Sequence, residues 1–153
     1  MKVREIMSSP VSTIAPTTEV RAIARLLVDN GISSVPVVDD QGQVVGMVTE
    51  SDLIVRNASL HFPRFLQILD ARVFLEGPRH FEEELRRMLG VTAEDVMSAP
   101  VISVSPDDDI ERAATLMWEK RIHALPVLQG GRLVGIVSEA DIVRLIANEA
   151  QTE

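Results

Sequence analysis

The feature of this sequence that most limits its possible folds is an internal duplication. The stretch VVGMVTESDL at 44–53 returns almost unchanged as LVGIVSEADI at 133–142. Two further pairs of segments align in the same order: MSSPV (7–11) with MSAPV (97–101), and ISSVPVV (32–38) with IHALPVL (122–128). Two copies are fewer than the three or so repeats that a solenoid needs. The sequence therefore predicts two half-domains packed around a pseudo-two-fold axis.

Each copy shows the same succession of local patterns. A β-branched stretch bounded by prolines comes first, at 10–16 and at 100–106, and is typical of a short edge strand or of an extended entry segment. Apolar residues then recur at helical spacing, and two apolar runs around a glycine-containing turn indicate a β-hairpin. A second helix follows each hairpin. The order β-α-β-β-α, present twice, predicts an α/β fold with helices packed against small mixed sheets.

The predicted domains follow this duplication. Residues 1–57 form the first repeat, residues 58–90 a connector outside the repeat, and residues 91–153 the second repeat. The connector contains all four phenylalanines, and its pattern predicts a helix from Pro78 to Gly90. Two interpretations of it stay open: a connector whose apolar face packs on the module or on a second subunit, or a lid over a bound ligand.

Composition excludes several classes of function. The chain of 153 residues has a net charge of −8 and no cysteine. The acidic balance disfavours nucleic-acid binding, which depends on basic residues, and the lack of thiols excludes disulfides, thiolate zinc sites and cysteine nucleophiles. No apolar run is long enough to span a membrane, and the N-terminus lacks the apolar stretch of a signal peptide. We therefore expect a cytoplasmic protein that binds neither nucleic acid nor membranes.

A hydroxyl residue followed three positions later by an aspartate ends each hairpin, as Thr49 with Asp52 and as Ser138 with Asp141. One interpretation is a capping box at a helix start, which contributes about 1 kcal/mol. The other is a ligand site, because nucleotides and anions gather where strands of α/β sheets end and helices begin. Aspartate is short enough to hold two ribose hydroxyls. The glycine three residues before each hydroxyl either bends the strand or leaves room for backbone or a ligand.

Together these motifs resemble the cystathionine-β-synthase (CBS) domain. The resemblance rests on an opening Met-x-x-Pro, a helix, an Ile-x-x-apolar-Pro-Val strand and a Gly-apolar-apolar-[Thr/Ser]-x-x-Asp step, all present twice within 3–57 and 92–148. It implies two β-α-β-β-α CBS repeats packed as one pseudo-two-fold Bateman module. It also implies up to two clefts for adenosine-containing ligands such as AMP, ADP, ATP or S-adenosylmethionine, and a homodimer that signals to a regulated protein.

In this family each cleft combines residues of both repeats. The resemblance assigns to one cleft Ser12, Ile32, Ser33, Ser34, Pro36, Ile136, Ser138 and Asp141, and to the other Met47, Thr49, Asp52, Ile102, Ile122, His123, Ala124 and Pro126. It implies that the aspartates and hydroxyls hold ribose and phosphate, while the aliphatic residues enclose the purine. His123 is then either a phosphate contact or an ordinary surface or partly buried histidine. Arg56 and Arg144, one turn beyond the aspartates, either contact phosphate or complement the helix dipole.

Catalysis is the least favoured class of function. The three histidines, His61, His80 and His123, lie in unrelated settings without triad or metal-binding spacing. The leading hypothesis is a sensor that binds adenine nucleotide, with no cofactor, metal or catalysis, and that responds because the ligand favours one packing of the halves. Two alternatives stay open: a dimerisation or interaction scaffold with vestigial clefts, and a module whose cleft is tuned to S-adenosylmethionine or to a metal. Trp118, the only tryptophan, fits a dimer surface or simple core filling.

Overall fold

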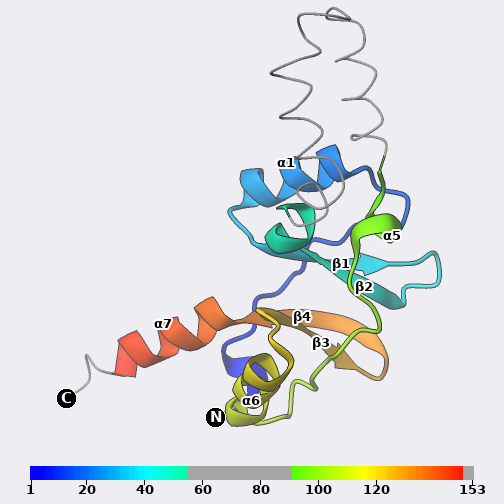
Figure 1. Ribbon diagram of the computed structural model, residues 1–153. Coiled ribbons are helices and arrows are strands. Elements are labelled where there is room, and N and C mark those ends of the chain that lie inside the picture. Colours follow the sequence, from blue (N-terminus) through cyan, green and yellow to red (C-terminus); the bar gives the residue numbers. More distant parts are fainter. Residues whose placement is uncertain (55–90, 150–153) are drawn as a thin grey trace, which may run out of the picture. The chain divides into compact units, whose positions relative to one another are not determined.

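The computed structural model describes residues 1–54 and 91–149 (Figure 1). In chain order its elements are η1 (Val3–Glu5), α1 (Val20–Asn30), β1 (Ser34–Val38), β2 (Val44–Thr49), α5 (Ala93–Val96), α6 (Ile110–Lys120), β3 (Ala124–Gln129), β4 (Arg132–Ser138) and α7 (Glu139–Glu149). Residues 50–54 are also helical. The predicted connector 58–90, with its helix and its possible lid, lies outside the described residues, as do Arg56, His61 and His80.

The chain folds into two compact units that cut across the sequence repeats. The C-terminal unit combines Met1–Ser12, Asp40–Val44 and Pro100–Glu153, and the N-terminal unit combines Thr13–Asp39 and Val45–Ala99. Residues 1–12, the N-terminal opening segment, therefore pack with the second repeat. Residues 91–99, the internal opening segment, pack with the first repeat. The predicted repeat boundaries at 57/58 and 90/91 border the undescribed residues and stay predictions.

Each unit holds one small sheet, β1–β2 in the N-terminal unit and antiparallel β3–β4 in the C-terminal unit. Single bridges extend both sheets with a parallel neighbour, at Ile14 beside Val37 and at Val104 beside Val127. The predicted α/β class with small mixed sheets is thus confirmed. Of the two expectations for 10–16 and 100–106, an edge strand or an extended entry segment, the structure shows only these bridges, because prolines at both ends of each stretch cannot donate to a ladder.

Helices α1 and α6 are capped by the opening segments rather than by their own side chains. Neither helix has a side-chain hydrogen bond at its N-cap residue. The first helical N–H of α1, from Val20, donates to the Val91 carbonyl at 2.9 Å, and that of α6, from Ile110, donates to the Met1 carbonyl at 3.1 Å. Because the first N–H groups of a helix have no partner within it, each opening segment satisfies a group that its helix leaves unpaired.

The two helices also end alike, each in a left-handed residue. Gly31 ends α1 at φ 60°, and Arg121 ends α6 at φ 54°. A side chain makes this conformation costly, by about 1–2 kcal/mol, so Arg121 replaces glycine here at a cost. None of the helices in residues 1–54 and 91–149 is long and apolar enough to cross a membrane.

Each unit has its own aliphatic core, and its opening segment contributes to it. In the C-terminal unit Val3 is fully buried with Leu125, Val127 and Val137. In the N-terminal unit the buried residues Ala93 and Val96 of α5 join the core, and Figure 1 shows α5 beside the β1–β2 hairpin. Full burial of one valine contributes about 1.5–3 kcal/mol. The opening segments are therefore parts of the two cores and not loose extensions.

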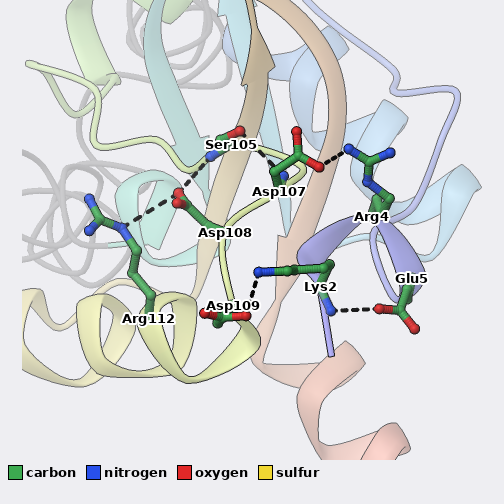
Figure 2. A network of polar contacts seen from close by, with 8 residues as sticks. All are labelled: Lys2, Arg4, Glu5, Ser105, Asp107, Asp108, Asp109 and Arg112. Carbon is green, nitrogen blue, oxygen red and sulfur yellow. Dashed lines mark hydrogen bonds and ion pairs between the residues drawn. The ribbon is translucent and has the colours of Figure 1, made fainter.

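Ion pairs add to this packing in the C-terminal unit (Figure 2). Lys2 Nζ lies 2.8 Å from Asp109 Oδ1, and the Arg4 guanidinium pairs with Asp107. The hydrogen bond from Lys2 lowers the pKa of the Asp109 carboxyl below its ordinary value, and the same contact raises the pKa of Lys2. The corresponding residues of the internal opening segment are Thr92 and Glu94, which carry no positive charge.

Candidate functional site

The hydroxyl-to-aspartate step forms a capping box in both units. The Thr49 N–H donates to Asp52 Oδ2 at 2.9 Å, and the Asp52 N–H donates to Thr49 Oγ1 at 3.2 Å. The Ser138 N–H donates to Asp141 Oδ2 at 2.8 Å, and the Asp141 N–H donates to Ser138 Oγ at 3.4 Å. These reciprocal bonds start the helix at 50–54 and helix α7. The capping interpretation is confirmed at both positions.

The remaining bonds of the carboxylates differ between the two units. Asp141 Oδ1 accepts from Arg144 Nη1 at 2.9 Å, and Oδ2 also accepts from the Ser138 hydroxyl at 2.8 Å. Asp52 Oδ1 accepts from the Ser98 hydroxyl at 3.3 Å, near the long limit for such a bond. Asp141 is only 6% exposed, whereas Asp52 is half-buried. The bonds from Ser98 and Arg144 to the two aspartates were not expected from the sequence.

The glycine before each step makes room for a methionine. A Cβ atom on Gly46 would lie 2.8 Å from Met97 Cγ, and one on Gly135 would lie 2.5 Å from Met7 Sδ. Neither glycine has a positive φ, so the requirement is for space. The close approach predicted at these positions is thus made by the methionine of the Met-x-x-Pro motif. Each contact joins the Met-x-x-Pro motif of one repeat to the glycine of the other repeat.

The other predicted site residues gather near the strands of both units. Buried among them are Ser34, Pro36, Met47, Ala124 and Pro126; half-buried are Ile32, Ile102, Ile122 and Ile136; exposed are Ser12, Ser33 and His123. Within one unit the structure groups Met47, Thr49 and Asp52, and likewise Ile136, Ser138 and Asp141. Each predicted cleft also takes residues from the other unit, so the full clefts stay predictions.

His123 is engaged by a residue that the sequence did not single out. Its Nδ1 lies 2.9 Å from Glu139 Oε2. The β3–β4 register pairs Ala124 with Ser138. His123, which precedes Ala124, and Glu139, which follows Ser138, therefore become neighbours. Both side chains line an open pocket of about 620 Å³ in the C-terminal unit, together with Met117, Trp118, Glu119 and Arg121. Hairpin register was the signal that could have predicted this pair.

Exposed apolar side chains occupy equivalent helix positions in the two repeats. Val28 on α1 is 79% exposed, and its counterpart Trp118 on α6 is 86% exposed. Ile54 and its counterpart Val143 are exposed as well, as is Ile146 on α7. The interpretation of Trp118 as core filling is therefore wrong. It lies at a solvent-facing position of α6, where the buried positions are held by Ile110, Ala113 and Met117.

Comparison with known proteins defines the family. The chain belongs to the CBS domain family, whose model matches residues 3–58 and 93–148. It is 32% identical, over 95% of its length, to the uncharacterized protein MJ1426 of Methanocaldococcus jannaschii, of which it covers 91%. It is 33% identical to the longer protein MJ1404 of the same organism, of which it covers 32%.

Solved structures share the fold of the whole chain. The CBS domain pair of protein MJ0100, solved in complex with 5′-methylthioadenosine and S-adenosyl-L-methionine, superposes with a TM-score of 0.74 at 25% identity. The match covers 97% of this chain and 98% of that one. The prediction of a tandem CBS pair is thus confirmed.

Proposed function

We propose that this chain is a regulatory module that binds adenosine-containing ligands and carries out no catalysis. The observation that supports this most is the pair of aspartates, Asp52 and Asp141, each held at a helix start directly after a strand. The similar CBS pair of MJ0100 was solved with two adenosyl compounds. Because a carboxylate has about four acceptor positions, a capping role leaves room for a ribose hydroxyl.

The aliphatic residues of the two units suit the purine. Ile32, Ile102, Ile122 and Ile136 are only half-buried, so each has apolar surface available to a ligand. Ligand pockets are lined mainly by such side chains, with a few polar groups that fix orientation. In the proposal the composite residue sets predicted from the sequence form the two clefts, with AMP, ADP or ATP as the ligands and S-adenosylmethionine as the alternative.

We propose that the chain carries out no catalysis because the side chains that could act as nucleophile or base are bonded to other partners. The Ser138 hydroxyl donates to Asp141, and the His123 ring contacts Glu139. The described residues thus offer no bonded serine–histidine pair for nucleophilic attack. Signalling requires instead that the ligand bind two arrangements of the module with different affinity.

The proposal includes a homodimer formed through the exposed helix positions. Val28 and Trp118 stand at equivalent places in the two repeats, and so do Ile54 and Val143. A second copy presents the same apolar side chains and is therefore self-complementary in chemistry. Contiguous exposed apolar patches mark protein–protein contacts in soluble proteins, and the proposal is that these positions contribute to such a contact.

A scaffold with vestigial clefts is the competing function, and the complete capping boxes favour it. Calorimetric titration of the full chain with AMP, ADP, ATP and S-adenosylmethionine separates the two. The sensor predicts that D52N or D141N weakens binding by about tenfold or more at the cleft that contains the replaced aspartate and leaves the other cleft able to bind, since a charge-assisted hydrogen bond is worth about 1.5–3 kcal/mol. The scaffold predicts no binding by the parent and only the loss of a cap, about 1 kcal/mol.

The chain contains a matched control for these variants. Thr92 and Asp95 form a further capping box at α5, with Thr92 N and Oγ1 lying 2.9 and 3.0 Å from Asp95 Oδ2. This geometry copies that of Ser138 and Asp141, but neither residue belongs to a predicted cleft. D95N should therefore lower stability without changing ligand affinity. An equal affinity loss in D95N and D141N would mean that the aspartates act only through folding.

A further inference from the structure

The two aspartates differ in how many acceptor positions remain open. Asp141 accepts from the Ser138 N–H, the Ser138 hydroxyl and Arg144. Asp52 accepts from the Thr49 N–H and, over a long distance, from the Ser98 hydroxyl. With about four positions per carboxylate and with donors counted among residues 1–54 and 91–149, Asp141 keeps one open position and Asp52 keeps two. The two hydroxyls of a ribose need two, so Asp52 can bind both as it stands and Asp141 cannot.

Arg144 is the partner of Asp141 that can leave. Its side chain is 67% exposed, whereas that of Asp141 is 6% exposed. The Ser138 bonds are part of the helix cap, so losing them would unwind the start of α7. Moving the Arg144 guanidinium requires only rotation of a surface side chain. The first repeat has Val55 at the corresponding position and Arg56 one place later.

We propose that Arg144 makes the Asp141 site selective for ligands that carry phosphate; this inference rests on the proposed adenosine-binding function. A ribose that takes both positions on Asp141 Oδ1 displaces the guanidinium. A phosphate on the same ligand then accepts hydrogen bonds from the released Arg144 guanidinium, since guanidinium and phosphate form strong, often bidentate bonds. A nucleoside without phosphate loses the Arg144–Asp141 bond and gains no replacement. No arginine among the described residues holds Asp52 in this way, so Arg144 should not affect the choice of ligand at the Asp52 site.

The test compares AMP with adenosine on full-length chains that keep one aspartate. In D52N, which keeps the Asp141 site, AMP should bind about tenfold or more tightly than adenosine, the equivalent of one charge-assisted hydrogen bond. Adding R144Q to D52N should tighten adenosine, weaken AMP and bring the two affinities close together. In D141N, which keeps the Asp52 site, R144Q should change neither the AMP nor the adenosine affinity.

Controls separate this inference from general effects of charge and from the proposed function. R112Q removes another exposed arginine of the C-terminal unit, one that lies 3.5 Å from Asp108, and should leave the AMP-to-adenosine ratio unchanged. An unchanged ratio after R144Q in the D52N chain, with binding retained, overturns the inference alone. Failure of the parent to bind any of the ligands overturns the proposed function and the inference with it. Should D52N unfold, the parent and R144Q are compared directly, because both contain the same Asp52 site.

Discussion

Each opening segment packs with the other repeat: residues 1–12 with the second and residues 91–99 with the first. This exchange of opening segments predicts a specific energetic coupling between Gly135 and Met7. In Gly135→Ala the new Cβ would lie 2.5 Å from Met7 Sδ and 3.2 Å from the Ser8 carbonyl oxygen, against an ordinary contact of about 3.5–4.0 Å. The methionine can move and the backbone oxygen can give only a little. We expect a loss of about 1–3 kcal/mol in the free energy of unfolding, as for other overpacked sites.

Removing the methionine should relieve most of this loss. Met7→Ala alone is destabilising because it leaves a hole above Gly135, but the added methyl of G135A partly fills that hole. The double variant G135A/M7A should therefore be more stable than the sum of the single losses predicts, by about 1–2 kcal/mol, within the range seen for residues in contact. The remaining contact with the Ser8 oxygen keeps the relief incomplete.

Chemical denaturation of the four chains measures this coupling, and the duplicated sequence supplies its control. Gly46 stands to Met97 as Gly135 stands to Met7, so G46A should couple with M97A in the same way. The crossed pairs G135A/M97A and G46A/M7A should be additive within about 0.5 kcal/mol. Coupling in the crossed pairs, or additivity in the direct ones, would refute the exchange of opening segments.

Three further outcomes are expected. Because the folded-state pKa of Asp109 is lowered, its pairing with Lys2 stabilises the fold above the ordinary pKa of 3.8 and is lost as pH falls; the difference in melting temperature between parent and D109N should therefore be constant near pH 6 and shrink below 3.8. R121G should raise the free energy of unfolding by up to about 1 kcal/mol, since glycine adopts the left-handed end of α6 without strain, and denaturation showing a loss would contradict this. W118E should shift the chain toward monomer in sedimentation with its circular dichroism unchanged, while E119K, at the next position, should not.

Much of this protein could be predicted from local sequence patterns. The duplicated stretches, the helical spacing before each hairpin and the glycine-containing turns all act within a few residues, so the α/β class and the repeated elements could be predicted correctly. The capping box could be predicted for the same reason, because Thr49 and Asp52 are three residues apart. The prolines around 10–16 limited the strands there to single bridges, and this was also readable in principle.

Other features depend on contacts between distant residues. Met7 meets Gly135 rather than Gly46, although both glycines follow the same motif. Only the charges of Lys2 and Arg4, opposite Asp107 and Asp109, hinted at this choice in the sequence. The exposure of Trp118 likewise required the structure, because an amphipathic pattern does not say which face a neighbouring helix leaves open.

The sequence by itself thus determined the order of the main repeated helices and hairpins and the capping boxes after each hairpin, since those depend on neighbours along the chain. Tertiary structure alone decided which opening segment completes which core. It also decided that Asp141 Oδ1 accepts a hydrogen bond from Arg144, whereas Asp52 Oδ1 accepts a long one from the Ser98 hydroxyl. The physical reason is that two nearly identical repeats offer nearly identical partners, and only packing and charge across the folded units distinguish them.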